Sequence, residues 1–144
     1  MKRIILVLVL AVGIAATAGF ARSERSGALH VTKECSAYDP TTASSFCTIT
    51  SSNIKVIRAG MRVVYASAAD LSAGMLDSDF VIDGPGHNAA FGHVVLDLHT
   101  LTGVVTLAGG TGRFTHFHAG PIMVACPAFP DCSWDGPYKF SPQD

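Results

Sequence analysis

The chain has 144 residues, of which 49% are hydrophobic and 15% charged, and its formal net charge is −1. This length is typical of one domain with one modest core. The slight excess of acidic side chains argues against a nucleic-acid partner or an anionic membrane surface, since either would favour a basic face.

Residues 1–21 are predicted to be a signal peptide. Lys2 and Arg3 precede an apolar run over residues 4–18, and the small residues Ala18 and Ala21 offer cleavage positions. The apolar run is short for a bilayer span, and a retained N-terminal anchor is the alternative. We therefore expect a secreted or periplasmic protein in which residues 22–144 form a single domain, with no membrane span after processing.

Four cysteines in an exported chain predict disulfides. We expect the pairs Cys35–Cys47 and Cys126–Cys132, because each would close a short loop rich in proline or serine. A zinc site built from all four thiolates is the alternative, but the chain lacks the paired C-x-x-C spacing that is typical of such sites.

The first half of the domain contains short alternating segments. A strand is predicted over residues 28–34, with Leu29, Val31 and Lys33 on one face, and a second strand over residues 47–50. Residues 54–58 and 61–67 are predicted to pair as a hairpin around the two-residue loop Ala59-Gly60. Residues 68–78 are expected to form a loop or a single helical turn.

The second half continues the same pattern. Strands are predicted at residues 79–83, 93–99, 104–107, 116–118, 122–125 and 134–140. Turn signals separate them at residues 84–88, 100–103, 109–112 and 120–121. Short strands separated by turns at these intervals predict an all-β domain, and we expect an eight-stranded antiparallel β-barrel whose closure would remove the exposed sheet edges.

The run Gly109-Gly110-Thr111-Gly112-Arg113-Phe114 lies between two of these strands. It resembles the GGTG-x-F corner of the allene oxide cyclase and dirigent-like β-barrels, which are related in shape to calycins. The resemblance implies an eight-stranded barrel, often trimeric, that binds an apolar small molecule and steers a cyclisation or coupling without a metal. The catalytic carboxylates and arginine of that family have no residue-by-residue counterpart here and are not transferred.

Candidate catalytic residues are His93, Asp97 and His99, which share one face of the predicted strand at residues 93–99. If that face lines the barrel, Asp97 with either histidine forms an acid/base pair suited to proton transfer. If it faces solvent, these are ordinary hydrated positions, and alternation alone does not choose between the two faces. The aromatic residues expected to form a ligand pocket are Tyr65, Phe91, Phe114 and Tyr138.

His116 and His118 would share a strand face and could bind copper or zinc. The chain does not fit the cupin pattern, because no glutamate follows His118 at the required spacing. It does not fit the copper/zinc superoxide dismutase pattern either, because the turn containing His87 precedes the His-x-His pair. We therefore expect no metal and no other cofactor.

The sequence thus predicts a secreted barrel that binds an apolar small molecule, with a cofactor-independent isomerase or cyclase as its enzymatic form. One alternative is a structural or protein-interaction module that forms homo-oligomers, either dimers or trimers. A second alternative is an extracytoplasmic copper- or zinc-binding protein.

Overall fold

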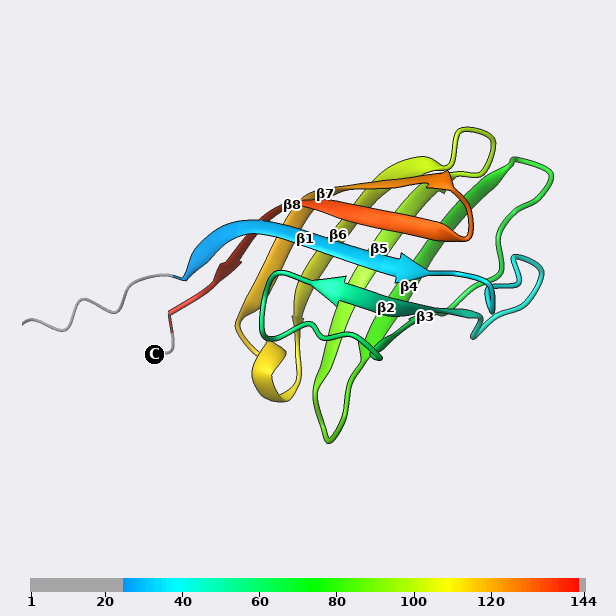
Figure 1. The fold of residues 1–144 in the computed structure, drawn as a ribbon. Coiled ribbons are helices and arrows are strands. Elements are labelled where there is room, and N and C mark those ends of the chain that lie inside the picture. Colours follow the sequence, from blue (N-terminus) through cyan, green and yellow to red (C-terminus); the bar gives the residue numbers. More distant parts are fainter. Residues whose placement is uncertain (1–24, 143–144) are drawn as a thin grey trace, which may run out of the picture.

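The computed structural model describes residues 25–142, which form a closed barrel of eight antiparallel strands in sequential order (Figure 1). The strands are β1 (Ser26–Glu34), β2 (Phe46–Ser52), β3 (Arg62–Tyr65), β4 (Met75–Asp83), β5 (Ala89–Asp97), β6 (Thr102–Gly110), β7 (Phe117–Ala128) and β8 (Asp131–Phe140). Each strand pairs with its sequence neighbours, and β1 pairs with β8 to close the sheet. The predicted fold class is therefore confirmed.

The alternation seen in the sequence explains why these segments pack as they do. Leu29, Val31 and Lys33 all point into the barrel, whereas His30 lies exposed on the outside. Met61, Val63 and Tyr65 also point inward, as their shared face predicts. Each strand thus contributes one apolar face to a common interior and leaves the other face to solvent.

Two aromatic clusters fill the two ends of the barrel. One cluster lies at the end where β1 leads into β2 and β7 leads into β8. There the aromatic rings pack in the order Tyr38, Tyr65, Phe80 and Trp134, and the centroids of successive rings are 5.3, 6.2 and 5.5 Å apart. This end is called the disulfide end. At the opposite end, called the glycine end, Phe117 contacts Phe114 at 5.7 Å and Phe140 at 5.1 Å.

Both predicted disulfides, Cys35–Cys47 and Cys126–Cys132, are present, and all four cysteines are buried. Disulfides fit a protein that folds outside the reducing cytoplasm. The predicted signal peptide lies outside the described residues. Among residues 25–142, none of the helical structure has the length and apolar character needed to cross a bilayer.

The predicted hairpin between residues 54–58 and 61–67 is wrong. Residues 53–61 form a turn-rich connection, and β3 pairs with β2 through Phe46, Cys47 and Thr48. The physical reason is visible at Val56 and Ile57, which are consecutive and both buried. A strand sends neighbouring side chains to opposite faces, so only a turn lets both pack against the barrel.

Several boundaries also differ from the prediction: β5 begins at Ala89 and ends at Asp97, β6 extends over Thr102–Gly110, and β8 begins at Asp131. The differences in β4 and β7 are the largest. β4 begins at Met75 within the segment expected to be a loop, because Leu76 and Ser78 continue the inward set of Phe80 and Ile82. β7 runs unbroken through Gly120-Pro121, where its pairing with β8 shifts register. Pro121 lacks an N–H donor, and the bulge accommodates that missing donor within the strand.

The glycine corner holds the glycine end together. Gly109 and Gly112 have φ values of 82° and 57°, the left-handed region that favours glycine. A Cβ at Gly110 would lie 2.0 Å from the carbonyl oxygen of Ala89, so the corner requires a residue without a side chain there. A short 3-10 helix, η1 (Gly112–Phe114), then places Phe114 at 0% exposure inside the barrel end.

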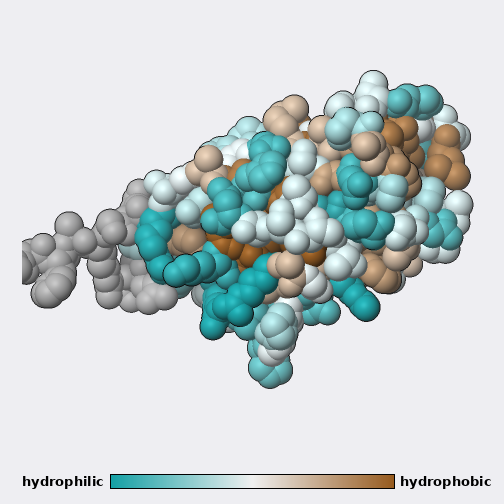
Figure 2. Space-filling view, in the orientation of Figure 1, coloured by the Kyte–Doolittle hydropathy of each residue, from teal (hydrophilic) through white to brown (hydrophobic). Residues whose placement is uncertain are grey.

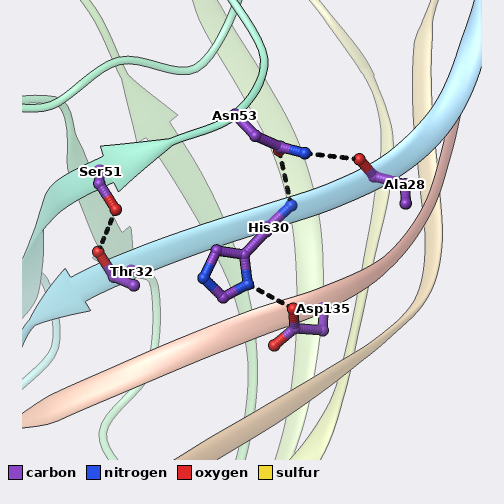
Figure 3. A network of polar contacts seen from close by, with 6 residues as sticks. All are labelled: Ala28, His30, Thr32, Ser51, Asn53 and Asp135. Atoms are coloured by element: carbon purple, nitrogen blue, oxygen red, sulfur yellow. Dashed lines mark hydrogen bonds and ion pairs between the residues drawn. The ribbon is translucent and has the colours of Figure 1, made fainter.

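Polar side chains tie β8, β1 and β2 together on the outer face (Figure 3). His30 Nδ1 contacts Asp135 Oδ1 at 2.5 Å across the β1–β8 pair. Beyond the end of β2, the Asn53 side chain accepts from the His30 backbone N–H at 2.7 Å and donates to the Ala28 carbonyl at 2.9 Å. Asn53 therefore extends the β1 hydrogen bonding past the last residue of β2.

Replacing Gly110 with alanine is expected to destabilise the fold by about 3 kcal/mol, because the added methyl group would overlap the Ala89 backbone. Chemical denaturation with disulfides intact measures this change. Gly60→Ala is the control: a Cβ there meets nothing within 4 Å, and only the φ of +91° opposes it, so a loss of about 1 kcal/mol is expected. Equal losses in the two variants would contradict the close-approach explanation.

Candidate functional site

His93 lies on the outer face of β5, between two aspartates of β4. His93 Nδ1 is 2.8 Å from Asp79 Oδ1, and His93 Nε2 is 3.0 Å from Asp77 Oδ1. The hydrogen bond to Asp79 is the largest cause of the raised pKa of His93. An imidazole that donates from both ring nitrogens is doubly protonated, so this arrangement favours a positively charged His93.

Asp97 and His99 are not brought to His93. Asp97 ends β5, four residues and about 13 Å along the strand from His93. Its carboxylate accepts the backbone N–H groups of His99 and Thr100 at 2.7 and 3.2 Å, and these bonds lower the pKa of Asp97. Asp97 and His99 therefore hold the turn between β5 and β6. The face that carries His93 and Asp97 points to solvent, so the acid/base pair that an inward face would have formed is not present inside the barrel.

An outer hollow of about 450 Å³ lies across β4, β5 and β6. It is lined by Ala66, Asp79, Phe80, Val81, Phe91, Gly92, His93, Thr106 and Ala108. Phe91 is 47% exposed at its edge, which is a large unburied apolar surface for a strand residue. This hollow, called the β5 hollow, brings the predicted ligand residue Phe91 and the predicted catalytic residue His93 to one place.

The other predicted ligand residues occupy different surroundings. Tyr65 and Phe114 are 3% and 0% exposed and pack in the cores of the disulfide end and the glycine end. Tyr138 contacts Phe117 at a centroid distance of 6.1 Å and also lines a second hollow of about 580 Å³ over β6, β7 and β8, where Gly120-Pro121 bulges. The four aromatic residues therefore do not form one pocket.

His116 and His118 flank the buried Phe117 at the start of β7. Among residues 25–142, no group of three or more histidine, cysteine or acidic side chains is arranged to hold a metal ion. His118 instead lines the hollow beside Tyr138.

Lys33 shares a strand face with Leu29 and Val31, as the alternation in the sequence predicts, but it was not among the predicted site residues. Lys33 is 5% exposed at the disulfide end, and its Nζ donates to Tyr65 Oη at 2.5 Å. The same ammonium group lies 4.9 Å from the ring centroid of Trp134 and 5.3 Å from that of Tyr65. These rings stabilise the charge through their π faces, and burial lowers the pKa of Lys33 to about 7.

The surroundings of Lys33 are aromatic and rich in hydrogen-bond donors. Burial raises the pKa of Tyr65, so this phenol stays protonated and can pair with Lys33 in either protonation state. Within the described residues, Tyr38 Oη and Trp134 Nε1 are buried and have no hydrogen-bond partner. The signal for this cluster in the sequence is a lysine in phase with Leu29 and Val31, since a charged residue on an apolar strand face is rare.

No known protein family, curated protein or solved structure matches the chain. The resemblance to allene oxide cyclase and dirigent-like barrels therefore remains a hypothesis that rests on the glycine corner.

Replacing Lys33 with methionine should change how stability depends on pH. Folding lowers the pKa of Lys33 from 10.5 to about 7, so between these pH values the folded protein binds fewer protons than the unfolded chain. The free energy of unfolding therefore rises with pH in this range, because the cost of burying the charged amine falls. From pH 7 to pH 9, we expect the free energy of unfolding of the wild type to increase by roughly 2 kcal/mol more than that of Lys33→Met.

Urea unfolding of both proteins at the two pH values measures this difference. Lys55→Met, at an exposed position, is the control, and its free energy of unfolding should change between the two pH values by the same amount as that of the wild type. If Lys33→Met and the wild type show parallel pH profiles, Lys33 is not held in a desolvating site.

Proposed function

We propose that the protein is an extracytoplasmic barrel that binds an apolar small molecule in the β5 hollow. The observation that carries this proposal is the exposed ring of Phe91 at the edge of a depression of about 450 Å³. Gly92 has no side chain, and Phe80 occupies the space beneath it, where a Cβ would come within 2.3 Å of the ring. The resulting apolar lining with a few polar groups is typical of small-molecule sites.

His93 and Asp79 supply the polar edge of this site. Both ring nitrogens of His93 are occupied by carboxylates. The charged imidazole can therefore donate an N–H to an electronegative atom of the ligand only if its hydrogen bond to Asp77 or Asp79 breaks. Such a group orients a ligand more readily than it accepts a proton. The geometry therefore supports binding more strongly than the isomerase or cyclase activity implied by the resemblance.

Removing the Phe91 ring should weaken binding of an uncharged apolar dye such as N-phenyl-1-naphthylamine by about fivefold, through the apolar contact area lost. Fluorescence titration of the Phe91→Ser variant measures this loss. Phe129→Ser is the matched control, because Phe129 is 52% exposed in the β7–β8 turn, outside the hollow. Equal affinity in the wild type and Phe91→Ser, or equal losses in both variants, would reject the β5 hollow as the site.

A second candidate function is homo-oligomer formation through the outer face of β5, β6 and β7. Val95, Val104 and Met123 are cross-strand neighbours there and are 39%, 39% and 57% exposed. The face over β8, β1 and β2 that is turned to the viewer in Figure 2 is covered mainly by hydrophilic and intermediate residues. A contiguous apolar row on one side of a barrel marks a surface suited to association.

Placing a charge in the middle of this row should oppose association. Val104→Lys is expected to shift the protein to a lower mass in size-exclusion chromatography with light scattering, because association would bury an unpaired ammonium group. Leu71→Lys, at a position 57% exposed in the β3–β4 connection, is the control and should leave the mass unchanged. A wild-type protein that is monomeric at high concentration would reject this candidate.

A further inference from the structure

The two disulfides lie against each other at the disulfide end. Cys35 Sγ is 3.9 Å from Cys132 Sγ, although each belongs to a different disulfide. The β1–β8 pairing causes this approach: Lys33 is paired with Cys132, and the Cys35 backbone N–H donates to the Pro130 carbonyl at 2.9 Å. Two neighbouring disulfides are thus buried at one end of the barrel.

The sulfur of Cys47 has polar neighbours that could stabilise it as a thiolate. Lys33 Nζ lies 3.9 Å from Cys47 Sγ, and Tyr65 Oη lies 3.7 Å from it. A thiolate is stabilised by a nearby cation and by hydrogen-bond donors, and a stabilised thiolate is a better leaving group in disulfide exchange. Lys33 also gains, because a buried ammonium group is less costly when it is paired with an anion.

We propose that the two disulfides form one exchange unit, in which a Cys132 thiolate attacks Cys35 and releases Cys47 as a thiolate held by Lys33 and Tyr65. The Cys35–Cys132 bond forms, the Cys35–Cys47 bond breaks, and the electron pair of the broken bond leaves on Cys47. The exchange is redox-neutral. The attacking and attacked sulfurs must close from 3.9 Å to the disulfide bond length of about 2.05 Å.

In the wild type, a dithiol reductant starts the sequence. It reduces Cys126–Cys132 with two electrons, is oxidised to its own disulfide, and leaves both cysteines as thiols. Cys132 then loses a proton and becomes the attacking thiolate, and the released Cys47 thiolate pairs with the protonated Lys33. The product keeps Cys126 as a thiol and carries one non-native disulfide, Cys35–Cys132.

The Cys126→Ser variant tests this exchange without any reductant, because it leaves Cys132 as the only unpaired cysteine of the native pairing. Acid quenching, alkylation with N-ethylmaleimide and peptide mapping identify the free thiol. We expect Cys47 to be alkylated about fivefold more than Cys132. Adding Lys33→Met should return the free thiol to Cys132.

The mirror variant, Cys47→Ser, is the matched control. Its unpaired Cys35 can attack Cys132 and release Cys126, but the sulfur contact of Lys33 is with position 47, so we expect the free thiol to remain mainly on Cys35. A free thiol that stays on Cys132 in Cys126→Ser, or that moves equally in both variants, would overturn the proposal.

If Cys126→Ser does not fold, limited reduction of the wild type with dithiothreitol gives a second test. The expected intermediate has Cys35 linked to Cys132, with Cys47 and Cys126 alkylated. Intermediates that contain only one native disulfide and no Cys35–Cys132 bond would overturn the exchange. This outcome is independent of ligand binding in the β5 hollow.

Discussion

Pairing between the first and last strands is the constraint on which the rest of the structure depends. Nine residue pairs, from Ser26–Lys139 to Glu34–Asp131, join β1 to β8 and remove both free edges of the sheet. The same register places Lys33 opposite Cys132 and puts Trp134 beside the Lys33 ammonium group. Closure therefore creates both the barrel interior and the contacts of Lys33 at the disulfide end.

Much of the barrel could be predicted because its signals are local. The inward positions of Leu29, Val31, Val63 and Phe80 follow directly from a period of two. Both disulfides followed from short loop closure, and the glycine corner followed from three glycines in four positions. The strand predicted at residues 54–58 was wrong because its apolar residues have the composition of a strand. Burial of the adjacent Val56 and Ile57 against the barrel end determines the conformation instead.

The candidate sites were harder to predict because they depend on contacts between strands. The partners of His93 are Asp77 and Asp79 of β4, and only the β4–β5 register identifies them. Asp97 is nearer to His93 in the sequence but is used by the turn after β5. The alternation in β1 puts Lys33 on the same face as Leu29 and Val31. The environment of its ammonium group, however, is formed by Tyr65, Trp134 and Cys47, which come from three other strands.

Strand closure can be measured directly by nuclear Overhauser spectroscopy combined with amide hydrogen exchange on the oxidised protein. Barrel closure predicts cross-strand contacts from β1 to β8, including Val31 with Trp134 and Leu29 with Gly136, and slow exchange of β1 amides on both sides of the strand. Absence of these contacts, with alternate β1 amides exchanging as rapidly as those of a free edge, would contradict closure and the arrangement of Lys33 and the disulfides that depends on it.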